Sequence, residues 1–209
     1  MGTGVFEDMS MLDEHKVLRN PIEQFKLWFV DAVTAELPMY EAMTLATSTP
    51  DGKPSARIVL LKQADENGFV FYTNYESRKG KELVSNPFAS LVFYWNALGR
   101  QVRVEGSIEK VSDTESESYF QSRPRESQIS AVVSSQSAVV ASREYLEEQW
   151  KNVEQQFAGK PVQRPKHWGG FRLKPQQIEF WQNRESRLHD RVLYQLQKDG
   201  NWKINRLYP

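Results

Sequence analysis

Residues 179–191 read Glu-Phe-Trp-Gln-Asn-Arg-Glu-Ser-Arg-Leu-His-Asp-Arg, an aromatic strand followed by a short turn and then a cationic segment. If the cationic segment is extended, alternate side chains point to the same face. The residues that share this face are Arg187, His189 and Arg191. A strand that only filled a core would not align three such groups, so the pattern predicts a site for a planar anion, with Trp181 nearby for stacking. The alternative interpretation is that Trp181 is an ordinary core residue and that His189 has a structural role.

The composition favours one domain in a soluble protein. The chain has 209 residues, and its 27 basic and 27 acidic residues give a formal net charge of zero, whereas a general nucleic-acid or anionic-membrane binder would carry a basic excess. The absence of cysteine excludes disulfides and thiolate metal sites, and three scattered histidines predict no metal centre. Neither a signal peptide nor a membrane-length apolar run is recognised, so we expect a cytoplasmic protein with no membrane partner.

Short β-rich runs separated by turn signals dominate the chain, with helices inserted between them. We expect residues 1–19 to form a mobile N-terminal arm and residues 20–209 to form a single domain. Asn20 and Pro21 predict a helix start, and the helix should end near 37–38. Further helices are predicted over 78–84, 113–122, 125–135 and 142–157, and strands over 42–48, 55–63, 69–74, 89–95, 101–111, 170–173, 178–182, 187–197 and 202–207. The prediction is a mainly β protein with inserted helices, and closing its antiparallel strands into a barrel would remove exposed edges.

Two cationic clusters lie beside predicted helix starts. Arg78 and Lys79 follow the N-cap Ser77. Cations disfavour a helix start, but they make sense there if a phosphate binds the free N–H groups. The alternative is a solvated basic turn.

In the second cluster, Tyr119 and Arg123 lie one helical turn apart, and Pro124 redirects the chain so that the next helix's first turn contains Ser127. A second phosphate could bind there; the alternative is an ordinary exposed helix end.

Other candidates are weaker on their own. The strand 57–62 is apolar between Arg57 and Lys62, and its parity places the two cations on opposite faces unless a bulge intervenes. It can also be read as a buried strand flanked by solvated charges. The amides of Gln101 and Gln136 suit recognition of a ring that carries both donors and acceptors.

Together these segments resemble the pyridoxamine (pyridoxine) 5′-phosphate oxidase family, from about Asn20 to Pro209. The stretch 179–191 is the most specific element, and 57–62, 71–74, 77–80, 100–106, 167–170 and 206–209 agree with it. The resemblance implies an FMN-binding split β-barrel homodimer with two FMN sites in the subunit interface. It also implies oxidation of pyridoxamine or pyridoxine 5′-phosphate by dioxygen to pyridoxal 5′-phosphate, with release of hydrogen peroxide and, from the amine, ammonia.

The resemblance also assigns roles to residues. It places against FMN the side chains of Arg57, Lys62, Tyr72, Thr73, Arg78, Lys79, Gln101, Gln136, Ser137, Trp181 and Arg191. It places against the substrate phosphate Lys62, Tyr119, Arg123 and Ser127, and it makes Arg187 and His189 the catalytic candidates, lying over the pyridine ring opposite the flavin. The chain lacks the N-terminal Arg-x-x-Tyr element that helps to close the site in some members, and the 96–99 turn lacks the proline common in the family.

Three rival interpretations remain at this point. A flavin reductase or a deazaflavin-dependent oxidoreductase on the same barrel would keep the FMN residues but should lack the Tyr119, Arg123 and Ser127 set and the Arg187 and His189 pair. A non-catalytic carrier of FMN or pyridoxal phosphate is a second alternative. A nucleic-acid module is a third, and the zero net charge disfavours it.

Overall fold

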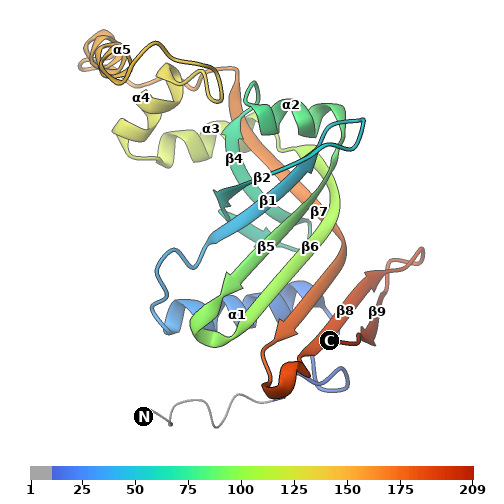
Figure 1. The fold of residues 1–209 in the computed structure, drawn as a ribbon. Coiled ribbons are helices and arrows are strands. Elements are labelled where there is room, and N and C mark those ends of the chain that lie inside the picture. The colour runs from blue at the N-terminus through green and yellow to red at the C-terminus, as the bar shows by residue number, and fades with distance from the viewer. Residues whose placement is uncertain (1–10) are drawn as a thin grey trace.

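A curled antiparallel sheet forms the body of the protein (Figure 1). The computed structural model describes residues 11–209. The strands are β1 (Ala42–Ser48), β2 (Pro54–Leu60), β3 (Gln63–Asp65), β4 (Gly68–Asn74), β5 (Phe88–Trp95), β6 (Arg100–Lys110), β7 (Trp168–Gln182), β8 (Asp190–Leu196) and β9 (Trp202–Arg206). Their hydrogen-bonded order is β2-β1-β5-β6-β7-β4-β3, and β8 pairs with both β7 and β9. This sheet confirms the predicted mainly β split barrel.

The long strand β7 is where the sheet divides. Its residues 168–173 pair with β4, and its residues 177–182 pair with β8, while β6 follows β7 on the other side. The register between β6 and β7 shifts between Glu105 and Gly106, opposite Pro175, which has no N–H to donate. The prediction of two separate strands over 170–173 and 178–182 was therefore wrong, because the bulge bends the strand without ending it.

The helices are inserted between strands, as predicted. They are α1 (Pro21–Thr34), α2 (Arg78–Ser85), α3 (Asp113–Ser122), α4 (Arg125–Val133) and α5 (Arg143–Gln156), with short 3-10 turns η1 (Asn96–Leu98) and η2 (Glu185–Arg187). The predicted caps are confirmed: Asn20 accepts a hydrogen bond from the N–H of Ile22, and Ser77 accepts one from the N–H of Gly80. Helix α1 ends at Thr34, before the predicted end near 37–38.

Helix α1 packs its aromatic side chains into the main core, at the lower end of the sheet in Figure 1. The ring of Phe25 lies 4.9 Å from Phe69 and 5.0 Å from Phe93, and the ring of Trp28 lies 5.1 Å from Phe180. Burying each such side chain contributes about 1.5–3 kcal/mol. These contacts bury the aromatic face of α1 against the sheet.

A second, smaller core lies among α3, α4 and α5, beyond the opposite end of the sheet (Figure 1). Its buried members are Phe120, Ile129, Ala131, Val162 and Trp168. Because Trp168 is the first residue of β7, this core anchors the helices to the sheet.

The predicted mobile arm, residues 1–19, falls partly outside the described residues. Residues 11–19 contact the C-terminal strands. Leu12 is buried, and its carbonyl accepts a hydrogen bond from Arg206 at 3.0 Å. The carbonyl of Leu18 accepts one from the phenol of Tyr194 at 2.7 Å. Across residues 11–209, no helix has the length and apolar character needed to span a membrane.

Candidate functional site

A cavity of about 610 Å³ lies between β2, β4 and helices α2 to α4. Nine of the predicted site residues line it: Arg57, Lys62, Tyr72, Thr73, Lys79, Tyr119, Arg123, Ser127 and Gln136. We call it the main cavity. Its lining within the described residues includes four Lys or Arg side chains and no Asp or Glu. Such a lining favours an anionic ligand.

The two cations of the 57–62 segment both reach the main cavity, although strand parity predicts opposite faces. The reason is that β2 ends at Leu60. The N–H of Leu61 then donates to Glu41, and the N–H of Lys62 donates to the carbonyl of Val70 on β4. The chain therefore changes partner strand between Arg57 and Lys62, and the alternation of faces does not carry across the change.

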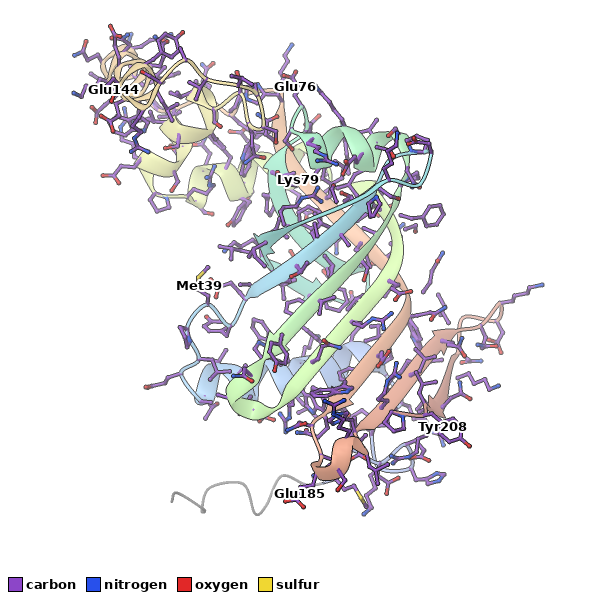
Figure 2. All side chains as sticks on the ribbon, in the orientation of Figure 1. Met39, Glu76, Lys79, Glu144, Glu185 and Tyr208 are labelled. Atoms are coloured by element: carbon purple, nitrogen blue, oxygen red, sulfur yellow. The ribbon has the colours of Figure 1, made fainter. Side chains whose placement is uncertain are left out.

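Lys79 is a buried cation in the first turn of α2, where the helix meets the sheet (Figure 2). Its Nζ donates to Gln136 Oε1 at 2.8 Å and lies 3.3 Å from Thr73 Oγ1. Within residues 11–209 it forms no ion pair. Burial lowers the pKa of Lys79, and the nearby Arg57 guanidinium lowers it further. A bound anion would supply the missing countercharge.

A buried carboxylate, which sequence reasoning did not single out, organises the cations beside the cavity. Glu82 is 5% exposed, and its oxygens lie 2.9 Å from Arg78 Nε and 3.3 Å from Arg57 Nη2. Burial by itself would raise the pKa of Glu82, but hydrogen bonds outweigh it and lower the pKa to about 2; the donors are Ser55, Thr47, Arg78 and Arg57. The i, i+4 spacing from Arg78 was the one sequence signal for this contact.

The predicted cluster of Tyr119, Arg123 and Ser127 is assembled at the junction of α3 and α4. Arg123 caps α3 with extended backbone, and the N–H of Ser127 donates to the carbonyl of Pro124 at 2.9 Å. The Nη1 atom of Arg123 is buried and has no hydrogen-bond partner among the described residues. Burial lowers the pKa of Arg123 and raises that of Tyr119. An unsatisfied buried guanidinium nitrogen suits an incoming anion.

Aromatic rings form one wall of the main cavity. Tyr72 stacks on Tyr119 with ring centroids 3.9 Å apart, and Trp168 continues the stack 5.5 Å from Tyr72. Burial raises the pKa of Tyr72 to about 12. Sequence reasoning did not identify Trp168 as a site residue, because only the β4–β7 pairing brings it beside Tyr72.

Arg78 and Ser137 lie at a second cavity of about 500 Å³. Gln136 lines both cavities, so the two adjoin at this residue. The side chain of Arg78 is largely exposed, and it forms an ion pair with Glu82. This ion pair offsets the unfavourable interaction of a cation with the positive end of the helix dipole. The two residues predicted to bind at this helix start therefore lie at neighbouring cavities, Lys79 at one and Arg78 at the other.

All but one of the remaining predicted residues form a separate cluster on the outer face of the sheet. Gln101 on β6 pairs with Trp181 on β7, which pairs with Arg191 on β8, so the three lie in one row across the strands. The ring of His189 lies 4.6 Å from that of Trp181, and its Nδ1 accepts a hydrogen bond from the N–H of Arg184 at 3.1 Å. We call Gln101, Trp181, His189 and Arg191 the outer-face cluster.

Arg187 departs from the predicted arrangement. Strand β8 begins at Asp190, and Arg187 closes the turn η2 with φ of 60°, so the segment 187–191 is not extended throughout. The prediction that alternation places Arg187 on one face with His189 and Arg191 was therefore wrong. Arg187 is exposed in the turn that leads to His189.

The main cavity and the outer-face cluster lie towards opposite ends of the sheet. Figure 2 labels Lys79 near the upper end of the sheet, and Glu185 and Tyr208 at the lower end. Arg191 belongs to the lower end, because its Nη1 donates to the carbonyl of Tyr208 at 2.8 Å while its Nε pairs with Glu179. A single chain therefore does not bring all the predicted site residues together.

The comparisons with known proteins agree over nearly the whole chain. The family model described as "Pyridoxamine 5'-phosphate oxidase" matches residues 29–182, and the one described as "Pyridoxine 5'-phosphate oxidase C-terminal dimerisation region" matches residues 168–209. A protein of Trichormus variabilis named "Pyridoxine/pyridoxamine 5'-phosphate oxidase" is 56% identical over 201 residues, covering 96% of this chain and 94% of that protein. One of the same name from Cupriavidus pinatubonensis is 55% identical, with the same coverage.

Solved structures show the same fold. PhzG from Burkholderia lata, crystallised with tetrahydrophenazine-1-carboxylic acid, superposes with a TM-score of 0.91 at 30% identity, covering 97% of this chain and 98% of that one. An FMN-binding protein of Nostoc punctiforme superposes with a TM-score of 0.73 at 16% identity, covering 91% and 98%, which bears on the fold alone. On the family match and the curated relatives, this chain belongs to the pyridoxamine 5′-phosphate oxidase family.

Proposed function

We propose that this protein is an FMN-dependent oxidase that converts pyridoxamine or pyridoxine 5′-phosphate into pyridoxal 5′-phosphate in the cytoplasm. Dioxygen is the electron acceptor and becomes hydrogen peroxide, and the amine substrate also consumes water and releases ammonia. The observation that carries the proposal is the main cavity, whose lining among residues 11–209 holds four cations and an aromatic wall but no carboxylate. Two phosphorylated aromatic molecules match this lining in charge and shape.

The residues fit FMN. Lys79 lacks an anionic partner among the described residues, and Arg57, Tyr72, Thr73 and Gln136 line the same cavity. We propose that these residues and Lys62 hold the cofactor, with Arg78 and Ser137 contributing from the second cavity. The family's dimerisation region covers residues 168–209. In a homodimer the outer-face cluster of one subunit would complete the site of the other, so Gln101, Trp181 and Arg191 of the partner subunit would contact the flavin.

The substrate phosphate would bind beside the junction of α3 and α4. The unsatisfied Nη1 of Arg123 supports this placement, and the candidates to share the phosphate with it are Lys62, Tyr119 and Ser127. Charge-assisted hydrogen bonds would fix one end of the substrate and so orient its ring.

When bound, FMN supplies the acceptor for the hydride that leaves the substrate carbon. The protein's part is to orient the substrate and to handle a proton on its amine or alcohol. We assign these tasks to Arg187 and His189. Since Nδ1 of His189 accepts a backbone hydrogen bond, Nε2 is the nitrogen available to the substrate heteroatom.

The test is an absorption spectrum of the purified protein before and after anaerobic addition of pyridoxamine 5′-phosphate. We expect flavin bands that bleach on addition and return with air, together with one peroxide per pyridoxal phosphate formed. A yellow protein whose bands do not respond would contradict oxidase activity and favour an FMN carrier. Because PhzG, crystallised with tetrahydrophenazine-1-carboxylic acid, is similar at 30% identity, that acid is the appropriate competing compound, and faster bleaching with it would contradict the proposed substrate.

A further inference from the structure

The guanidinium of Arg123 lies over the ring of Trp168, which belongs to an aromatic stack. Its Cζ is 4.6 Å from the centre of the Trp168 ring. The planes of Trp168 and Tyr119 differ by 8°, and those of Trp168 and Tyr72 by 12°. One cation and three nearly parallel rings therefore form a continuous wall of the main cavity, and Trp168 is the member that contacts Arg123.

Arg123 has little else to hold it. Among residues 11–209 its side chain forms no ion pair and no hydrogen bond, and its other ring contact, with Phe120, is longer at 5.9 Å. A long flexible side chain loses about 2 kcal/mol of rotamer entropy when it is fixed, so an unrestrained Arg123 would be costly to order on binding. Stacking on an indole restrains the guanidinium and leaves its in-plane N–H donors free.

Arg100 and Trp28 form a matching pair elsewhere in the molecule. The Cζ of Arg100 also lies 4.6 Å from its indole, and Trp28 and Trp168 are 5% and 6% exposed. Arg100, however, pairs with Asp31 at 2.6 Å and bonds to Gln182 at 3.1 Å. Arg100 and Arg123 thus lie at the same distance from an indole ring. Arg100, outside the main cavity, has polar partners, whereas Arg123 Nη1, at the main cavity, has none among the described residues.

We propose that Trp168 is a positioning residue that holds Arg123 ready for the substrate phosphate and thereby sets the preference for phosphorylated over unphosphorylated substrate. This inference rests on the proposed function. Trp168 lines the main cavity and contacts Arg123, so its removal should weaken the recognition of the phosphate more than that of the ring.

The test compares two unreactive ligands, 4-deoxypyridoxine 5′-phosphate and 4-deoxypyridoxine, titrated calorimetrically into the FMN-loaded protein. The variants are Trp168→Leu, Trp168→Phe, which keeps a smaller ring under the guanidinium, and the control Trp28→Phe. For Trp168→Leu we expect the Kd of the phosphorylated ligand to rise about tenfold, equivalent to about 1.4 kcal/mol, and that of the unphosphorylated ligand to change less than about twofold. Trp168→Phe should recover part of the loss, and Trp28→Phe should resemble the wild type.

Several outcomes would overturn the inference. Equal weakening of both ligands in the Trp168 variants would show general damage to the cavity, and an unchanged phosphate preference would show that Arg123 does not need the indole. A loss of preference in Trp28→Phe as large as in Trp168→Phe would point to stability alone. If the wild type shows no preference for the phosphorylated ligand, or does not oxidise pyridoxamine 5′-phosphate, the proposed function fails before Trp168 is considered.

Discussion

At the scale of single residues, Glu82 decides how the cations beside the main cavity are arranged. It is a buried carboxylate between Arg57 on β2 and Arg78 on α2, and it accepts hydrogen bonds from the hydroxyls of Thr47 and Ser55. Removing one member of such a network leaves buried donors unsatisfied, which costs about 1–3 kcal/mol. The residue therefore ties fold stability to the geometry of the site.

Replacing Glu82 with glutamine should lower the free energy of unfolding by about 1–3 kcal/mol at pH 7. The pKa of Glu82 falls from its ordinary 4.5 to about 2 in the folded protein. The network therefore stabilises the fold above the ordinary pKa, and this contribution is lost as the pH falls towards 2. Urea denaturation from pH 7 down to the lowest pH at which the fold persists should show the gap between wild type and variant narrowing below about pH 4.5. The exposed Glu148→Gln is the control, and a pH-independent gap would contradict the assignment.

At the scale of elements, the bend in β7 allows one strand to serve two parts of the sheet. The bend depends on Gly106, because a Cβ at that position would lie 1.9 Å from the carbonyl oxygen of Lys174. Since the obstacle is backbone, no rotamer change can relieve it. The close approach at Gly106 therefore fixes the geometry that carries Trp168 to the main cavity and Trp181 to the outer face.

Gly106→Ala should destabilise the protein by about 3 kcal/mol, because the two strands must separate to admit the methyl group. Gly52→Ala is the matched control: its Cβ would meet nothing within 4 Å, and only its positive φ of 85° carries strain, about 1–2 kcal/mol. Thermal unfolding followed by circular dichroism measures both. A Gly106→Ala protein as stable as Gly52→Ala would mean that the β6–β7 contact is looser than the structure indicates.

At the scale of the whole molecule, the candidate residues divide between the two ends of the sheet, and Figure 2 labels Lys79 near one end and Glu185 and Tyr208 at the other. Arg123 and Lys79 lie at the main cavity, whereas Trp181 and His189 lie in the outer-face cluster. A two-fold dimer would place one cluster of each subunit against the complementary cluster of the other and create two equivalent sites. The division of residues is therefore the reason to expect a shared site.

Subunit complementation tests this expectation. We expect Arg123→Ala and His189→Ala each to be nearly inactive when pure. After the two are unfolded together and refolded, roughly a quarter of wild-type activity should return, because half the dimers are mixed and each mixed dimer has one intact site. Mixing Arg123→Ala with Lys79→Ala, which damage the same cluster, should restore nothing. Activity that fails to return in the first mixture would mean that His189 acts with the cavity of its own chain.

The sequence by itself determined most of the elements and much of the main cavity. Local signals placed the caps Asn20 and Ser77, and helical spacing joined Tyr119 to Arg123, since these depend on neighbours within one turn. Only the tertiary structure decided the rest: the switch of strand partner that brings Arg57 and Lys62 together, the turn that displaces Arg187, and the pairing that lays Trp168 beside Tyr72. The strand switch and the Trp168 pairing depend on contacts between separate segments, and such contacts leave no periodic trace in the residues that make them. The turn at 185–187 is local, but its positive φ angles interrupt the alternation that an extended segment would show.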